Sequence, residues 1–485
     1  MDTPLLPETR LFIGGTWRDA TGGTTFTVIA PATEQPIAEV AAATDADVDA
    51  AVAAARAQSD GGPWSRTSGG ERAKLLWRIA DLVEADAERL AHLEAIDVGR
   101  PIAEPRNGDV PNVVETFRHY AALADMLRGE AVPVADYLGR ARHSYTRREP
   151  VGVVAAITPW NAPTMIAAWK IAPALAAGCT LVVKPPQDAC LSTLRLVELI
   201  AEAGAPAGVI NAIPGRGSEI GIPLVTHRGV DKVSFTGSPE VGHEIAVAAG
   251  GRFKRLTLEL GGKSPQLVFP DADLDRVFPT AAASLFANQG EVCAAATRVF
   301  VHERLRDEVV ERLADAARAV RVGDPLDPDT TMGALINQRR LDTVLHYVES
   351  GRREGAELVA GGSRLDRPGY FVEPTVFVGS NDMTIAREEI FGPVGTVIPF
   401  SDPDEAIRQA NDSAYGLTAV VWTEDLGTAH RTAAALNAGV VWVNGWGVPD
   451  PRLPWGGVKT SGVGRELGLA GLHAHTEEKL VNVIL

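Results

Sequence analysis

Apolar and polar positions form a repeating pattern over residues 151–260, with short apolar runs separated by longer stretches of helical periodicity. The pattern predicts strands at 151–157, 180–183, 209–213, 232–235 and 255–260, and helices at 165–177, 192–203, 218–226 and 237–249. Strands that alternate with helices are typical of right-handed crossovers and a parallel sheet covered on both faces. This region is therefore expected to be a Rossmann-like nucleotide domain.

A second series of the same kind follows Gly262, so two α/β domains are the simplest interpretation. It predicts strands at 266–269, 298–301, 397–400, 418–422 and 440–444, and helices at 274–288, 304–320, 406–411 and 426–436. The glycine-bearing turn at 259–264 suits a crossing between the domains, with a cleft beside it. Residues 140–148 and 477–485 resemble short strands with polar flanks, as in an arm that pairs with another subunit.

Composition and charge narrow the class of protein. The chain has 485 residues, of which 45 % are hydrophobic, and this length predicts more than one structural unit. The net charge of −16 would repel a phosphate backbone or an anionic membrane, so no nucleic-acid or membrane partner is expected. The longest apolar stretch, 171–183, is too short to span a bilayer. The N-terminus lacks the basic start and apolar run of a signal peptide, which favours a cytoplasmic location.

The chain has three cysteines, Cys179, Cys190 and Cys293, in no spacing typical of a metal site, so no metal is expected. They fit free thiols in a reducing compartment. Cys293 follows Gly290 and a polar loop, where a reactive thiol would be accessible, whereas the other two have apolar or helix-start neighbours. A lone cysteine is more often a small buried apolar residue, and that alternative stays open from the residues alone.

Two further polar residues stand at predicted strand ends. Glu259 closes an alternating strand just before two glycines, where a carboxylate could act as a general base on water; a solvated glutamate is the alternative. Asn161 follows the first predicted strand, at the edge where open parallel sheets bind ligands. Its amide could donate to an oxyanion, or the residue could simply cap a helix.

Other positions carry weaker signals. The run Gly237–Gly242 follows a strand and opens a helix, so its N–H groups could hold a pyrophosphate, although the spacing differs from G-x-G-x-x-G. Lys184 ends the second strand and could bind ribose hydroxyls, or be an ordinary charged strand end. Glu389 and Lys170 cannot be distinguished from surface charges by the residues around them.

Taken together, five motifs resemble those of the aldehyde dehydrogenase superfamily, in its order and approximate spacing, and the likeness runs from about Arg10 to the C-terminus. They are Phe235-Thr-Gly-Ser238, Glu259-Leu-Gly-Gly-Lys-Ser-Pro265, Gln289-Gly-Glu-Val-Cys293, Glu389-Ile-Phe-Gly-Pro393 and Pro454-Trp-Gly-Gly-Val-Lys-Thr-Ser-Gly462. The resemblance implies a Rossmann-like cofactor domain, a second α/β catalytic domain and a small β oligomerisation arm. The cofactor domain is expected to comprise 1–128 and 150–260, the catalytic domain 261–445, and the oligomerisation arm 129–149 and 472–485.

The resemblance also implies the roles of catalytic residues. Cys293 would be the nucleophile, Asn161 and the Cys293 N–H would form the oxyanion hole, and Glu259 would activate the water that hydrolyses the thioester. Lys170 would belong to the surroundings of the proton relay. The glutamate at 259 favours hydrolysis, because the branch that transfers the acyl group to CoA lacks it.

By the same resemblance the cofactor is NAD, with NADP as the second option. Lys184 and Glu389 would hold the two riboses, and the other residues expected beside the cofactor are Trp160, Phe235, Gly237, Ser238, Val241, Leu260 and Phe391. Gln187 stands where the family pattern has a glutamate that repels a 2′-phosphate, so this chain lacks that repulsion. NADP use is therefore a serious alternative.

The expected substrate channel departs from that of many relatives, because Ala162 and Pro449 replace aromatic residues. Its other residues would be Met165, Trp169, Val292, Trp446 and Trp455. A roomy apolar channel favours bulky apolar or aromatic aldehydes. A semialdehyde or phosphorylated aldehyde, with Arg452 as an anion clamp, is the alternative, and a non-catalytic cofactor-binding or structural protein on this fold is the alternative from another class. A homotetramer or homodimer is expected from the resemblance.

Overall fold

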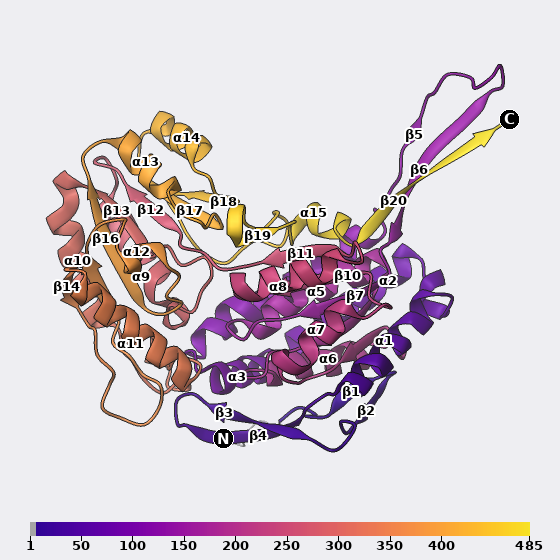
Figure 1. Cartoon of the computed structure of the whole chain (residues 1–485), viewed down its shortest axis with the longest axis horizontal. Helices are drawn as coiled ribbons and strands as arrows, with labels where there is room; N and C mark the ends of the chain where they lie inside the picture. Colours follow the sequence, from indigo (N-terminus) through magenta and orange to yellow (C-terminus); the bar gives the residue numbers. More distant parts are fainter. Residues whose placement is uncertain (1–5) are drawn as a thin grey trace.

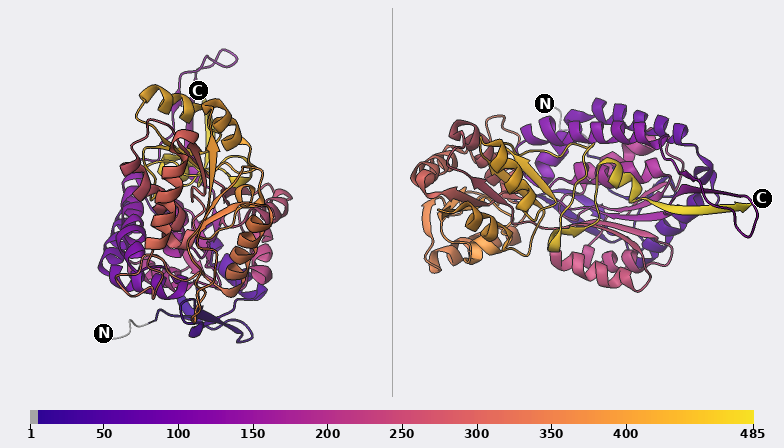
Figure 2. Two further views of the ribbon diagram at one scale, coloured as in Figure 1. Left: turned by 90° about the vertical axis from the view of Figure 1, so that its left-hand side faces the viewer. Right: turned by 90° about the horizontal axis from the view of Figure 1, so that it is seen from above.

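The computed structural model describes residues 6–485, and the first five residues of the expected cofactor domain lie outside that range. Two large sheets, each within its own set of helices, stand side by side, and a narrow β ribbon projects from the end of the first (Figure 1). Seen from above, the ribbon extends along the long axis, away from the second sheet (Figure 2). The predicted α/β architecture is confirmed.

The first sheet has the order β19-β11-β10-β7-β8-β9-β1-β2. Its five central strands are parallel and match the predicted ones: β7 Val153–Ile157, β8 Thr180–Lys184, β9 Ile210–Ala212, β10 Lys232–Thr236 and β11 Arg255–Glu259. The antiparallel edges are β1 Leu11–Ile13, β2 Thr16–Arg18 and β19 Gly462–Val463. Strand β19 belongs to a segment that returns from the second sheet to pair beside Glu259.

Alternation along the central strands explains why helices cover both faces. In β7, Val154 and Ala156 enter one apolar cluster, while Val153 and Ala155 enter another. The first cluster includes side chains of α2 Gly69–Ala85, α3 Ala87–Val98, α4 Val110–Ala124, α5 Pro163–Ala177 and α6 Leu191–Glu202. The second includes side chains of α1 Asp45–Ser59, α7 Gly217–Thr226 and α8 Pro239–Gly250. A sheet that is apolar on both faces is typical of parallel α/β structures.

The second sheet has the order β14-β15-β16-β13-β12-β17-β18 and is parallel except for β14. Its strands are β12 Pro265–Val268, β13 Arg298–His302, β14 Glu357–Ala360, β15 Thr375–Val378, β16 Val394–Phe400, β17 Thr418–Trp422 and β18 Val440–Val443. Its helices are α9 Leu274–Phe286, α10 Arg306–Ala319, α11 Gln338–Arg353, α12 Thr384–Arg387, α13 Pro403–Asn411 and α14 Leu426–Ala435. The predicted crossing at 259–264 joins β11 of the first sheet to β12 of the second.

The projecting ribbon consists of β5 Ala131–Val132, β6 Arg142–Pro150 and β20 Thr476–Ile484. Strands β6 and β20 pair antiparallel over their whole length, which confirms the two predicted strands, with the bounds of β6 shifted by two residues and those of β20 by one. The remaining elements are the hairpin of β3 Thr25–Ala30 and β4 Gln35–Ala41, and α15 Gly468–His473. Within residues 6–485, no helix combines the length and apolar character needed to cross a bilayer.

Three predicted helix boundaries were wrong for local reasons. The helix predicted to reach residue 288 ends at Phe286, because Asn288 and Gln289 have φ of 48° and 55°, in the left-handed region. The helix predicted from Gly237 begins at Pro239, because Ser238 caps it through its hydroxyl oxygen. The helix predicted from 304 begins at Arg306, after a separate short turn.

Candidate active site

Cys293 lies where two cavities meet. It follows a turn in which Gly290 has φ of 70° and lies so close to Gly392 that a Cβ there would be 2.3 Å from its carbonyl oxygen. Only glycine fits that approach. Cys293 is partly exposed, whereas Cys179 and Cys190 are buried. Both cavities are lined by Cys293 and Asn161, so the thiol is reachable from either side.

The first cavity, here called the sheet-edge cavity, has a volume of about 560 Å³ and lies at the carboxyl ends of β7, β10 and β11. Glu259 and six of the expected cofactor residues line it: Trp160, Gly237, Ser238, Leu260, Glu389 and Phe391. Sequence reasoning missed other lining residues, among them Arg339, Arg340, Tyr347 and Tyr415, because α11 and the loop before β17 reach this edge only through the fold. The cavity is large enough for a cofactor-sized ligand.

Glu389 is oriented by the crossing segment. Its Oε1 accepts a hydrogen bond from the N–H of Gly262 at 2.9 Å, and a Cβ at Gly261 would lie 1.9 Å from Oε2, so a side chain at 261 would displace the Glu389 carboxyl. Burial raises the pKa of Glu389 to about 7, although the Gly262 N–H opposes the shift. Trp160 and Phe391 pack edge to face nearby, with ring centroids 5.3 Å apart.

The other expected cofactor residues are neighbours of this cavity rather than part of its wall. Lys184 is buried, and its Nζ donates to the Pro185 carbonyl oxygen at 2.9 Å. Burial lowers the pKa of Lys184 to about 8. Phe235 packs against Gly237, where a Cβ would lie 2.4 Å from the ring. Gln187 is partly exposed and Val241 is exposed on α8.

The second cavity, here called the apolar cavity, has a volume of about 530 Å³ and is formed between the segment at 100–109 before α4, helices α5 and α9, the Cys293 loop and the loop at 446–455. All seven residues expected in the substrate channel line it: Ala162, Met165, Trp169, Val292, Trp446, Pro449 and Trp455. Small side chains that sequence reasoning missed, including Ala283, Ala287 and Gly108, also line it. Arg100, Glu104 and Asp109 give it a polar corner.

Hydrogen bonds fix the aromatic wall of the apolar cavity. The Trp169 indole donates to Asn112 Oδ1 at 2.8 Å, and Asn112 Nδ2 donates to the Pro449 carbonyl oxygen at 2.7 Å. The Trp446 indole donates to the Ala294 carbonyl oxygen at 3.1 Å. Buried indole N–H groups need such partners, and these partners set the orientation of both rings. Arg452, the expected anion clamp, is absent from the wall and pairs with Asp450 on the surface.

One amide hydrogen of Asn161 has no acceptor among residues 6–485. Its Nδ2 donates to the Glu291 carbonyl oxygen at 2.8 Å. A primary amide has two N–H donors, so this bond uses one and leaves the other for a ligand oxygen. The bond also ties the end of β7 to the loop that carries Cys293.

Glu259 is a buried carboxyl at the end of β11. Neither of its oxygens has a hydrogen-bond partner among the described residues. Burial raises the pKa of Glu259 well above its usual value, and Glu466 raises it further, while Lys170 opposes the shift. The raised pKa makes the Glu259 carboxyl a better proton acceptor, once ionised, than an exposed glutamate would be.

Lys170 is fully buried in α5 and bonded to residues of two other segments, β10 and the return segment that carries Glu466. Its Nζ lies 2.7 Å from Glu466 Oε1 and donates to Thr236 Oγ1 at 2.8 Å and Ser234 Oγ at 3.3 Å. Glu466 was missed by sequence reasoning, because it lies 296 positions away in the chain.

Among the residues that the structure describes, none of the groups that chiefly shift the pKa of the Cys293 thiol is a cation. Burial, together with the carboxyls of Glu389 and Glu259, raises the pKa of the thiol to about 12. Formation of the thiolate therefore needs a base in the site or a change in charge when a cationic ligand binds.

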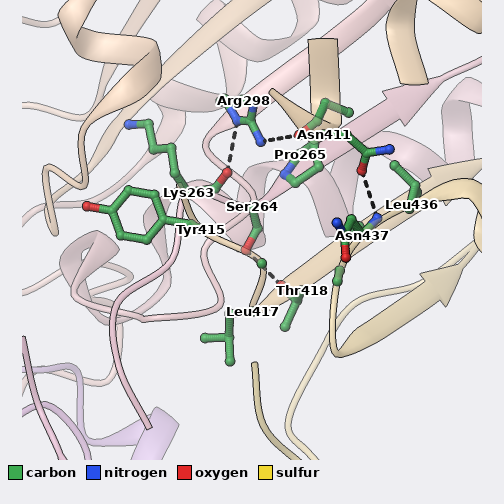
Figure 3. Close-up of a pocket in the computed structure, with 14 residues that line it drawn as sticks. Lys263, Ser264, Pro265, Arg298, Asn411, Tyr415, Leu417, Thr418, Leu436 and Asn437 are labelled. Carbon is green, nitrogen blue, oxygen red and sulfur yellow. Dashed lines mark hydrogen bonds between the residues drawn. The ribbon is translucent and has the colours of Figure 1, made fainter. Parts of the chain in front are cut away.

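A third cavity beside the crossing is too small for an organic ligand. Its volume is about 10 Å³, which is at the lower limit for one water molecule (Figure 3). Arg298 closes one side and donates from Nε to the Lys263 carbonyl oxygen at 2.9 Å, and Thr418 donates to Ser264 Oγ at 2.8 Å. These bonds fix Lys263 and Ser264 of the crossing segment, directly after the glycine whose N–H binds Glu389.

Comparisons with known proteins identify the family of this chain. The model of the Aldehyde dehydrogenase family matches residues 17–481. The chain is 45 % identical to an aldehyde dehydrogenase of Enchytraeus buchholzi, over 100 % of this chain and 99 % of that one. It is also 45 % identical to retinal dehydrogenase 2 of Homo sapiens, over 98 % and 92 %. The NAD⁺ complex structure of an aldehyde dehydrogenase from Bacillus cereus matches with a TM-score of 0.96 and 44 % identity, over 99 % and 97 %.

Fold, site and these matches define an oxidoreductase of the α/β class that acts on the aldehyde group. The chain belongs to the aldehyde dehydrogenase family.

Proposed function

We propose that this enzyme oxidises a bulky apolar or aromatic aldehyde to a carboxylic acid, with NAD as the oxidant, through a thioester on Cys293. The observation that carries the proposal is the position of Cys293 between the sheet-edge cavity and the apolar cavity. A thiol in that position can contact an aldehyde that enters from one side and face a hydride acceptor on the other.

The sheet-edge cavity suits a dinucleotide. Glu389 would supply a half-buried acceptor and Lys184 a buried donor for ribose hydroxyls, and α8 presents its N-terminus at Ser238 for a pyrophosphate. Gly237 keeps the backbone close to Phe235 at the start of that helix. Bound NAD supplies the acceptor for the hydride and a positive charge that favours the thiolate.

The chain's own residues account for the remaining steps. Cys293 loses its proton to water in the site, its sulfur forms a bond to the aldehyde carbon, and the carbonyl oxygen becomes an oxyanion. The free N–H of Asn161 and the Cys293 N–H stabilise that charge. Loss of hydride re-forms the carbonyl as a thioester. Glu259 then takes a proton from water, the hydroxide adds to the thioester, and the carbon–sulfur bond breaks to release the acid and the Cys293 thiolate.

Lys170 and Glu466 provide an exit for the proton held by Glu259. The two side chains form a buried pair 2.7 Å apart, and Glu466 raises the pKa of Glu259. We propose that they belong to the path by which this proton leaves the site.

The small side chains and indoles that line the apolar cavity support the substrate preference. Ala162, Ala283 and Ala287 leave room beside Cys293, and the cavity has the volume of a drug-sized ligand site. The semialdehyde alternative is less well supported, because its expected anion-binding residue, Arg452, pairs with Asp450 outside the cavity.

The use of NADP and the assembly of the protein stay predictions. The neutral Gln187 permits NADP as a second cofactor. The ribbon of β6 and β20 leaves Leu480 and Leu485 exposed at 59 % and 66 %, which supports its use as the contact in a homodimer or homotetramer. The cytoplasmic location also stays a prediction.

The test is the absorbance of reduced nicotinamide when NAD or NADP is mixed with aromatic, terpenoid, short aliphatic and semialdehyde substrates. We expect the highest kcat/KM with bulky apolar aldehydes, and a fall of about 10⁴-fold or more in Cys293→Ala. The highest kcat/KM with acetaldehyde would refute the substrate preference. Cofactor binding without turnover of any aldehyde would instead support the non-catalytic alternative.

A further inference from the structure

Asn288 stands between the two segments that supply the proposed oxyanion hole. It lies in the turn after α9, five positions before Cys293, and is buried. Its φ of 48° places it in the left-handed region, which asparagine tolerates better than most residues.

The amide of Asn288 bonds to both segments at once. Its Nδ2 donates to the Asn161 carbonyl oxygen at 2.7 Å and to the Glu291 carbonyl oxygen at 3.3 Å. Glu291 is the residue whose carbonyl also receives the Asn161 amide. Asn161, Glu291 and Asn288 therefore form a closed set of hydrogen bonds that fixes the end of β7 against the Cys293 loop.

A buried ionic cluster holds Asn288 from the other side. Its N–H donates to the Glu104 carboxylate, at 3.0 Å and 3.1 Å from the two oxygens. Arg100 donates from Nη2 to Glu104 at 3.1 Å and also bonds to Asp109. A charged acceptor strengthens the bond to the backbone N–H and makes the turn hard to move.

The same cluster reaches the Asn161 segment by a second route. Arg100 lies 3.5 Å from Glu94, whose other oxygen accepts the N–H of Thr164 at 3.0 Å in the first turn of α5. Asn161 stands immediately before that helix. Arg100 thus connects the turn before Cys293 and the start of α5 through one guanidinium.

We propose that Asn288, held by Glu104 and Arg100, is a positioning residue that keeps the Asn161 amide aligned with the Cys293 N–H for the oxyanion. The inference rests on the proposed function. Removal of the side chain should leave the thiol in place and able to react, but should misalign a donor whose benefit depends on its distance from the developing charge.

The test separates reactions that form an oxyanion from one that does not. Asn288→Gly keeps the left-handed backbone and its N–H while it removes the amide; Asn288→Asp keeps the shape but removes both donors. Three rates are measured for each: aldehyde oxidation, Cys293-dependent hydrolysis of p-nitrophenyl acetate, and alkylation of Cys293 by iodoacetamide. Alkylation is a displacement at an sp³ carbon, so it needs a thiolate and no oxyanion hole.

A matched control comes from Asn444, which also has a positive φ, 53°, and donates from Nδ2 to a carbonyl oxygen, that of Thr423 at 2.8 Å. Asn444→Gly makes the same change in a turn that lacks these bonds to Asn161 and Glu291. Thermal unfolding of all variants is recorded, so that a general loss of stability is visible.

We expect both Asn288 variants to lose about 30-fold in kcat for aldehyde and ester, with alkylation within about twofold of the wild type. Glu104→Gln should show a smaller loss in the same direction, because a neutral amide still accepts the N–H of Asn288. An equal fall in alkylation, or no selective loss relative to Asn444→Gly, would overturn the inference. A wild type without Cys293-dependent turnover would overturn the proposed function itself.

Discussion

The two cavities that meet at Cys293 are built in different ways. The sheet-edge cavity is formed at the ends of β7, β10 and β11, and close backbone approaches at Gly237 and Gly261 shape its wall. The apolar cavity is formed by the sides of α5 and α9 and by loop segments, including 100–109 and 446–455, with alanines and indoles on its wall.

The difference teaches where chemistry and selectivity reside in this enzyme. Strand ends carry single polar groups at fixed positions, which suits a cofactor site and reaction steps that are the same for every substrate. Helix sides and loops present apolar side chains that can be replaced. Such replacements change which size of substrate fits, without disturbing the nucleophile. Changes on the first side should alter the reaction steps, and changes on the second should alter which aldehyde is used.

The largest expected effect comes from Glu259 on the sheet-edge side. Glu259→Gln keeps the shape but removes the base that activates water, so turnover should fall about 10³-fold while the first hydride transfer still occurs. Mixing should therefore release one equivalent of reduced nicotinamide, and the protein mass should increase by that of the acyl group. A steady-state rate near that of the wild type, without an acyl adduct, would contradict the role of Glu259.

The pH profile sharpens the same experiment. Because the pKa of Glu259 is raised, its carboxyl stays protonated at a pH where an exposed glutamate is already charged, and wild-type turnover should fall as pH is lowered through that raised pKa. The variant can use only hydroxide from solution. Its turnover should increase about tenfold per pH unit, without the wild-type plateau.

Much of the sheet-edge side could be predicted because its signals are local. Strands β8 and β11 were predicted to within one residue at both ends, and each ends on the polar residue that the sequence singled out, Lys184 and Glu259. Glu389 and Phe391 stand in one short motif and line the same cavity. Their roles in binding the cofactor stay predictions.

What could not be predicted depends on contacts between distant segments. Glu466 meets Lys170 only because the return segment pairs β19 with β11. The turn at Asn288 looked like the end of a helix, since its left-handed backbone has no distinct pattern of apolar residues. Helices α1 to α4 and α11 were not predicted, although α11 and the segment at 100–109 before α4 supply walls of the two cavities.

The next effect, of intermediate size, concerns the apolar side. Ala162→Phe should place a ring in the cavity beside Asn161 and lower kcat/KM for bulky aldehydes about 30-fold, with short aliphatic aldehydes changed less than about threefold. The measurement is kcat/KM across a graded series of aldehydes, with Ala162→Val as a smaller step. An equal loss for every substrate would mean that the change disturbs Asn161 rather than the space available.

The smallest expected effect returns to the sheet-edge side at Gln187, which is partly exposed. Gln187→Glu restores a negative charge where the family pattern has one, and repulsion of a 2′-phosphate about 4 Å away in water is worth about 1 kcal/mol. The ratio of kcat/KM for NAD to that for NADP should therefore rise about fivefold. Because salt screens charges near the surface, the rise should shrink as ionic strength increases. An unchanged ratio at low salt would show that Gln187 does not face the adenosine ribose, and cofactor choice would then depend on other residues near Lys184.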